Sequence, residues 1–172
     1  MFKDIDIEMP RVAGLYHVIL HGKSLDIMKR GAVDIAYYKS LNIPGSEGVG
    51  IKFEEGLSGI VAVYKEGILS KSYNKPWQVQ LKMLEEKNAE FQRENPSWKI
   101  IFPPNAATAV EVAQEVWDKH NINVLPKDTR VGDGSVSVGF NPNPSRGFGV
   151  TFGISPDQPI RFVGVLPLVV PK

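Results

Sequence analysis

Segments with strand character and segments with helix character alternate along this chain, and their order recurs once. Residues 12–64 read as strand, helix, strand, strand, and residues 98–154 show the same order. The spacing of apolar residues distinguishes the two types of segment. Apolar residues recur at every second position in a half-buried strand and at every third or fourth position in a helix. The order predicts an α+β fold with two βαββ units and a helix between them.

Three helices are predicted, near residues 24–41, 76–94 and 106–120. Ser24 and Asn105 precede the first and the third, and side chains of these types accept hydrogen bonds from the free N–H groups of a first helical turn. We expect the apolar stripes of the three helices to cover one face of a mostly antiparallel sheet.

A second grouping of the same elements stays open. Residues 11–102 also have the element order βαββαβ, which is the ferredoxin-like order. The rest of the chain then forms an αβββ extension. The duplicated order is similar to that of the small-ligand-binding domains related to gyrase inhibitory proteins, a resemblance of topology over most of the chain. In a duplicated βαββ fold a cleft can form between the halves, and its candidate lining residues are Tyr16, His17, Tyr64 and Trp98.

The composition limits both size and chemistry. With 172 residues, 42% of them hydrophobic, the chain suits a single domain over residues 1–172 with its own core. The absence of cysteine excludes disulfides, thiolate catalysis and Cys-based zinc sites. A formal net charge of +1 argues against a dedicated nucleic-acid binder, which usually has a basic excess.

The sequence also bears on location. No stretch approaches the roughly 20 apolar residues that a membrane-spanning helix needs. The start of the chain is acidic and has no apolar run, so it does not read as a signal peptide. We therefore expect a protein of the cytoplasm, or of a virion assembled inside a cell, with no membrane partner.

One short run resembles a nucleic-acid-binding motif. Residues 146–152, RGFGVTF, resemble the RNP1 motif of RNA-recognition domains, although the aromatic residue between the second glycine and the valine is missing. Residues 145–149 also resemble the glycine-rich loop of CRISPR RNA-processing proteins, which are built from ferredoxin-like halves. An RNA-recognition domain continues with a helix and a strand, whereas this chain continues with strand character only. RNA binding or processing is therefore a further alternative, and a nucleic-acid partner is not expected.

Side chains suited to catalysis are sparse. His17 lies on a mostly apolar strand and is the first candidate for a general base, because the ordinary pKa of histidine is near neutrality. The three histidines have no spacing typical of a metal site, and no Gly-x-Ser-x-Gly nucleophile elbow occurs. Asp133 and Asp157 lie in turn contexts. The sequence therefore favours a protein that is not an enzyme and that uses no cofactor and no metal.

The leading hypothesis is a non-enzymatic assembly or structural protein, for instance a viral or phage protein, that forms a homo-oligomer or joins other subunits. The C-terminal segment suggests this, because both faces of an extended chain are apolar there. One face then needs a covering helix or a neighbouring subunit, and a neighbour is favoured. The predicted interface residues are Phe162, Val163, Val165, Leu168 and Val170. A small-molecule-binding domain of the duplicated βαββ type is the alternative.

Overall fold

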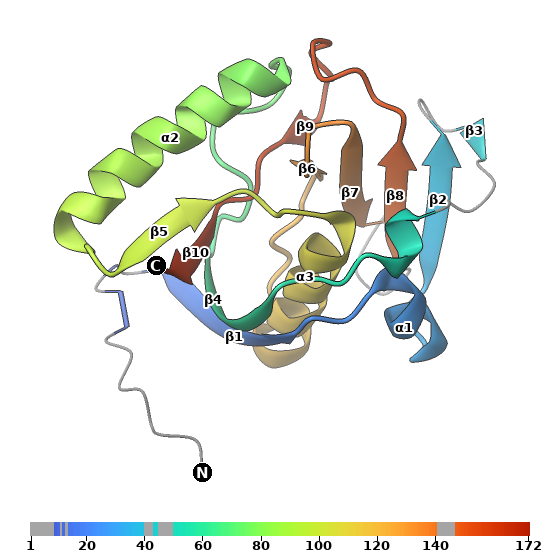
Figure 1. Ribbon diagram of the computed structural model, residues 1–172, viewed down its shortest axis with the longest axis horizontal. Helices are drawn as coiled ribbons and strands as arrows, with labels where there is room; N and C mark the ends of the chain where they lie inside the picture. Colours follow the sequence, from blue (N-terminus) through green and yellow to red (C-terminus); the bar gives the residue numbers. More distant parts are fainter. Residues whose placement is uncertain (1–8, 11, 13, 40–42, 45–49, 141–146) are drawn as a thin grey trace.

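The protein has an α+β fold of two β-sheets and three α-helices within the part of the chain that the computed structural model describes (Figure 1). The described residues are 9–10, 12, 14–39, 43–44, 50–140 and 147–172. The four-stranded sheet has the order β1-β4-β10-β5, with β1 Leu15–His21, β4 Ser58–Tyr64, β10 Leu168–Pro171 and β5 Trp98–Ile101. The six-stranded sheet has the order β3-β2-β8-β7-β6-β9, with β3 Ile43–Pro44, β2 Ile35–Lys39, β8 Phe148–Phe152, β7 Val136–Phe140, β6 Asp128–Val131 and β9 Val163–Gly164. The helices are α1 Leu25–Arg30, α2 Trp77–Glu94 and α3 Ala106–His120.

The elements are arranged in layers, with α3 between the two sheets (Figure 1). Both sheets and α3 contribute to the larger apolar core, in which Val110 of α3 and Val138 of β7 are fully buried. A smaller core lies on the other face of the four-stranded sheet, where Leu84 and Phe91 of α2 pack against the strands. The four-stranded sheet is therefore covered on both faces.

β10 lies in the interior of the four-stranded sheet. Leu168 is paired antiparallel with Val63 of β4 on one side and with Ile101 of β5 on the other. Leu168 belongs to the larger core and Val169 to the smaller core beside α2, and both side chains are 0% exposed. A strand that is buried on both faces has to be apolar at nearly every position, as this segment is.

The C-terminal segment that was predicted to form an interface therefore packs mostly within its own chain. Val163, Val165, Leu168 and Val170 are buried within their own chain, and of the five predicted residues only Phe162 is largely exposed, at 49%. The element that covers the second face is α2 of the same chain, which is the alternative that the sequence left open.

The first predicted helix, over residues 24–41, is wrong in its second half. Ser24 does cap α1, since its hydroxyl accepts a hydrogen bond from the N–H of Ile27 at 3.3 Å. The helix ends after six residues, where Ala32 takes a left-handed conformation with φ of 77°. β2 begins at Ile35 with a β-branched and aromatic run that favours a strand. Residues 40–41 lie outside the described part.

The other two predicted helices are confirmed. α2 begins directly after Pro76, whose missing N–H costs nothing at a helix start. Asn105 caps α3, because its Oδ1 accepts a hydrogen bond from the N–H of Thr108 at 3.0 Å. α3 ends at Asn121, which adopts the left-handed conformation common after a helix.

The predicted repeat is not found. Residues 12–64 contribute two strands to each sheet, whereas residues 98–154 contribute only β5 to the four-stranded sheet and three strands, β6, β7 and β8, to the six-stranded sheet. Residues 51–53 form a short 3-10 helix instead of a strand, and residue 49 lies outside the described part. The ferredoxin-like alternative is also wrong, because that fold places its fourth strand beside its first, whereas β5 lies at the opposite edge of the sheet from β1. Element order along the chain does not determine which sheet a strand joins.

A search of the described helices finds none that is both long enough and apolar enough to cross a membrane.

Substitution of Leu168 by alanine tests the position of β10. We expect Leu168→Ala to lower the free energy of unfolding by about 2–5 kcal/mol, because it leaves a cavity in the larger core. The control is Ile19→Ala on β1, where the side chain is 53% exposed and the loss should stay below about 1 kcal/mol. Urea denaturation measures both. Equal losses for the two variants would show that Leu168 is not a core residue.

Candidate functional site

The four residues predicted to line a cleft do not lie together. Tyr16 packs on the α3 side of the four-stranded sheet, with its ring centroid 4.6 Å from that of His120. His17 is paired with Ala62 on the α2 side, where Tyr64 also lies. Trp98 is on β5, at the opposite edge of the sheet from β1 and roughly 14 Å away across three strand spacings. Trp98 is a core residue, 2% exposed.

Tyr64 packs the sheet against α2. The ammonium group of Lys87 lies 4.4 Å from the centroid of its ring. Burial raises the pKa of Tyr64, and the carboxylates of Glu66 and Glu90 raise it further. These contacts give Tyr64 a packing role.

His17 lacks the surroundings of a general base. Its Nε2 atom is buried and has no hydrogen-bond partner in the described part of the chain. Burial lowers the pKa of His17, so the imidazole is neutral at pH 7. A general base needs a substrate within hydrogen-bond reach, yet His17 borders neither of the two hollows described next.

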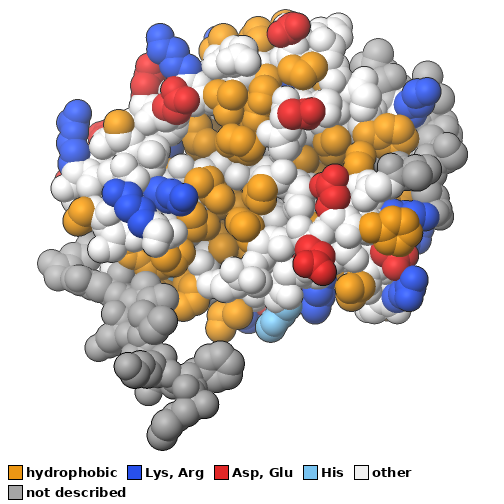
Figure 2. Space-filling view, viewed as in Figure 1, with side chains coloured by type: hydrophobic (Ala, Val, Ile, Leu, Met, Phe, Trp, Pro, Cys, Tyr) orange, Lys and Arg blue, Asp and Glu red, His pale blue; other side chains and the backbone are white. Residues whose placement is uncertain are grey.

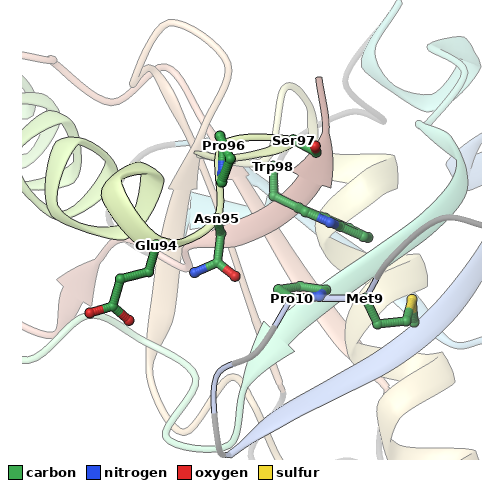
Figure 3. A pocket seen from close by; sticks show the side chains of 7 residues that line it. All are labelled: Met9, Pro10, Glu94, Asn95, Pro96, Ser97 and Trp98. Atoms are coloured by element: carbon green, nitrogen blue, oxygen red, sulfur yellow. The ribbon is translucent and has the colours of Figure 1, made fainter.

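A small hollow lies where the beginning of the chain meets the end of α2 (Figure 3). Met9 and Pro10 lie on one side of it, and residues 94–98 form the other. Its volume is about 130 Å³, whereas small-molecule sites usually measure about 300–1,000 Å³. The hollow is therefore too small to hold a typical ligand.

A larger hollow of about 710 Å³ lies on the outer face of the six-stranded sheet, the face turned away from α3. Its floor carries Asp128, Ser137 and Thr151 from the neighbouring strands β6, β7 and β8, with Ser137 directly opposite Thr151. The chain after β8 forms its wall. We call this hollow the sheet cleft, lined by Asp128, Ser137, Thr151 and residues 153–155 and 158–163.

Strand alternation places these polar side chains outward. Thr129 and Val131 of β6 point inward, as does Val138 of β7, and all three are buried. Because successive side chains of a strand point to opposite faces, Asp128 and Ser137 point outward into the sheet cleft.

Asp128 is the carboxylate on the floor of the sheet cleft. Its Oδ2 accepts a hydrogen bond from the Ser137 hydroxyl at 3.4 Å. Its side chain occupies the space that a Cβ would need at Gly139, so a larger residue there would displace the carboxylate. Burial raises the pKa of Asp128, and the hydrogen bond from Ser137 opposes this shift. Within the described residues Asp128 has no ion-pair partner.

Arg130 holds the wall of the cleft in place. Its side chain is 0% exposed. One guanidinium nitrogen, Nη1, donates to the carbonyl oxygens of Gly134 at 2.9 Å and Ser155 at 3.2 Å, and the other, Nη2, donates to that of Gln158. Burial lowers the pKa of Arg130, but a guanidinium stays protonated in proteins. This buried charge is therefore compensated by backbone dipoles, which fix the loop over residues 155–158.

The start of α2 meets the same turn. Gly134 has φ of +87°, and the ring of Trp77 lies where a Cβ would stand. The N–H of Trp77 donates to the carbonyl oxygen of Pro156 at 2.8 Å. The β6–β7 turn, the cleft wall and α2 are thus joined around Arg130.

Phe162 forms the rim of the sheet cleft in a strained conformation. Its φ is 72°, and a left-handed conformation costs a residue with a Cβ about 1–2 kcal/mol. The Nζ atom of Lys127 lies 4.2 Å from the ring centroid, and the guanidinium carbon of Arg161 lies 4.8 Å from it. Backbone strain of this kind is found preferentially at functional sites.

The sequence did not reveal the sheet cleft. No element was predicted over residues 121–131, so β6 and its outward Asp128 and Arg130 were missed. The sequence does contain a signal for this strand, because charged residues alternate with Thr and Val over residues 128–131. Such alternation is typical of a strand with one polar face. Asp157 does lie in the predicted turn.

Neither metal-ligand geometry in the described residues nor comparison with known proteins identifies a chemistry for this chain. Among the described residues, no three His, Asp or Glu side chains gather closely enough to hold a metal ion. Comparison of the chain with protein-family models, with curated proteins and with solved structures gives no match. The sheet cleft is therefore the feature of the described residues from which a function can be inferred.

Replacement of Arg130 tests its role in the cleft wall. We expect Arg130→Ala to lower the free energy of unfolding by about 3 kcal/mol or more, because several buried carbonyls lose their donor and a cavity is left. Arg130→Lys should also destabilise, since an ammonium group cannot reproduce the guanidinium fork. Urea denaturation measures the loss, and amide exchange at residues 155–158 should accelerate. The exposed Arg161→Ala is the control, and a loss equal to that of Arg130→Ala would contradict this role.

The pH dependence of stability tests the environment of Asp128. A raised pKa in the folded state means that the stability contributed by Asp128 is fully present below its unfolded pKa and is lost as the pH rises through the folded pKa. Asp128→Asn cannot ionise, so the unliganded variant should be more stable than the wild type at pH 7. The difference should shrink as the pH falls toward about 4.

Thermal unfolding between these pH values measures the effect of Asp128→Asn. The control is Asp157→Asn, an exposed carboxylate that does not line the cleft, and it should show little difference. A variant less stable than the wild type at pH 7, or a difference independent of pH, would contradict a shielded carboxylate.

Proposed function

We propose that this protein binds a small molecule in the sheet cleft. The main support for this proposal is the environment of Asp128. Its carboxylate is shielded, lies in a hollow of about 710 Å³ and has no ion-pair partner among the described residues. The volume falls in the range of about 300–1,000 Å³ typical of small-molecule sites. Such sites combine mostly apolar walls with a few polar groups that orient the ligand.

The construction of the cleft supports this proposal. Its floor consists of three hydrogen-bonded strands, and its wall is fixed by the hydrogen bonds of Arg130. A site held in one geometry before binding loses less conformational entropy when the ligand arrives. Ile154 and Val163 give the wall an apolar surface, while Ser137 and Thr151 supply hydroxyl groups.

The two other functions considered from the sequence receive less support. The assembly hypothesis rested on a C-terminal segment that packs within its own chain. The RNP1-like run offers no exposed stacking platform at Phe148, which is 1% exposed. On the face drawn in Figure 2, Lys and Arg side chains are interspersed with Asp and Glu side chains. Homo-oligomerisation and a location in the cytoplasm or a virion stay predictions of the sequence.

A thermal-shift screen with a metabolite library tests the proposed function. A ligand at about 100 times its Kd stabilises a protein by about 2.7 kcal/mol, which raises the Tm of a chain of this size by about 5–10 °C. Thr151→Phe places a ring in the cleft and should abolish the shift. Ser58→Phe places the same ring on an exposed strand residue of the other sheet and should keep it. The proposal fails if no compound stabilises the wild type more than Thr151→Phe.

A further inference from the structure

The charges around the sheet cleft indicate the class of its ligand, an inference that rests on the function proposed above. Lys127 and Arg130 are close to Asp128 in the sequence, and Arg161 lines the same cleft. The Nη atoms of Arg130 donate to backbone carbonyls, while Lys127 and Arg161 lie against the ring of Phe162. None of the three forms an ion pair with Asp128, whose one described hydrogen bond is the 3.4 Å contact from Ser137.

A shielded carboxylate without a counter-ion favours a cationic ligand group. An ammonium group brings a positive charge and three hydrogen-bond donors, and hydrogen bonds between charged partners are roughly twice as strong as those between neutral ones. A neutral, hydroxyl-rich ligand would donate hydrogen bonds but would leave the charge of Asp128 uncompensated. The geometry therefore favours an amine at the floor of the cleft.

The rim of the cleft has the opposite charge. Lys127 and Arg161 are exposed, and neither has a carboxylate partner among the described residues. Two unpaired cations beside one opening attract an anionic group. The lining of the cleft also includes the apolar side chains of Ile154 and Ile160.

We infer that the ligand of the sheet cleft carries an ammonium group that pairs with Asp128, an anionic group that faces Arg161 and Lys127, and an apolar portion that packs against the wall. Apolar amino acids and short peptides with free termini have this chemistry. A volume of about 710 Å³ is large enough for either.

Isothermal titration calorimetry with a matched set of probes tests the inference. L-Phenylalanine and L-leucyl-L-phenylalanine carry both charges, phenethylamine carries only the ammonium group, and 3-phenylpropionate carries only the carboxylate. We expect a zwitterionic probe to bind most tightly. Tighter binding of the dipeptide than of phenylalanine would identify peptides as the ligand class, and the reverse order would identify amino acids.

Two variants separate the two charged contacts. Asp128→Asn should weaken both zwitterions and phenethylamine by about tenfold or more without weakening 3-phenylpropionate. Arg161→Gln should weaken only the probes that carry a carboxylate, by up to about fivefold, because this side chain is exposed. Arg93→Gln, an exposed arginine on α2, is the matched control and should change nothing. Circular dichroism establishes that each variant is folded.

The outcomes distinguish this inference from the function on which it rests. The inference is overturned if 3-phenylpropionate binds as tightly as phenylalanine, or if Asp128→Asn binds phenylalanine as well as the wild type does. If no probe binds, but neutral library compounds stabilise the wild type and not Thr151→Phe, the ligand class is wrong and the sheet cleft remains a binding site. If no compound does so, both proposals fail.

Discussion

The C-terminal chain joins the two sheets, and the rest of the fold depends on this crossing. β9 pairs with β6 at the edge of the six-stranded sheet, and β10 then fills the interior of the four-stranded sheet. Buried backbone groups need hydrogen-bond partners along such a path. The N–H of Val165 donates to the hydroxyl of Ser72, and the carbonyl of Val163 accepts from the side-chain amide of Gln80. Buried polar side chains therefore satisfy the backbone where sheet pairing is interrupted.

The same crossing helps to shape the sheet cleft. The chain segment that forms the wall is fixed near its beginning by Arg130, which binds the carbonyl of Ser155, and at its end by the pairing of Val163 with Asp128 in β9 and β6. Between these points the strained Phe162 is held at the rim. Strain of this kind persists only when the surrounding structure over-determines the conformation of the residue. The C-terminal packing thus contributes to the geometry of the proposed binding site.

The parts of the fold that depend on nearby residues could be predicted from the sequence. α2 and α3 were predicted because Pro76 and Asn105 mark their starts and their apolar residues recur at helical spacing. The segment of β2 was predicted as helix because Ala32 and Ile35 also fit a helical spacing. The left-handed conformation of Ala32 ends the helix before β2 begins. Strand pairing could not be predicted, since β10 meets β4 and β5 across long stretches of chain. The sheet cleft was missed for the same reason, because it combines β6, β7, β8 and the following loop.

Two charged residues lie on one face of β6, and they differ in whether hydrogen bonds compensate their charge. Arg130 is fully buried, yet several carbonyl oxygens accept its hydrogen bonds, so its charge is compensated within the chain. Asp128 lies two residues earlier on the same face, and its single weak contact with Ser137 leaves its charge largely uncompensated. Burial without compensation destabilises the charged form of a carboxylate. Groups that disfavour the unliganded fold in this way are concentrated at functional sites. This contrast is the physical reason for assigning Arg130 to the scaffold and Asp128 to the ligand.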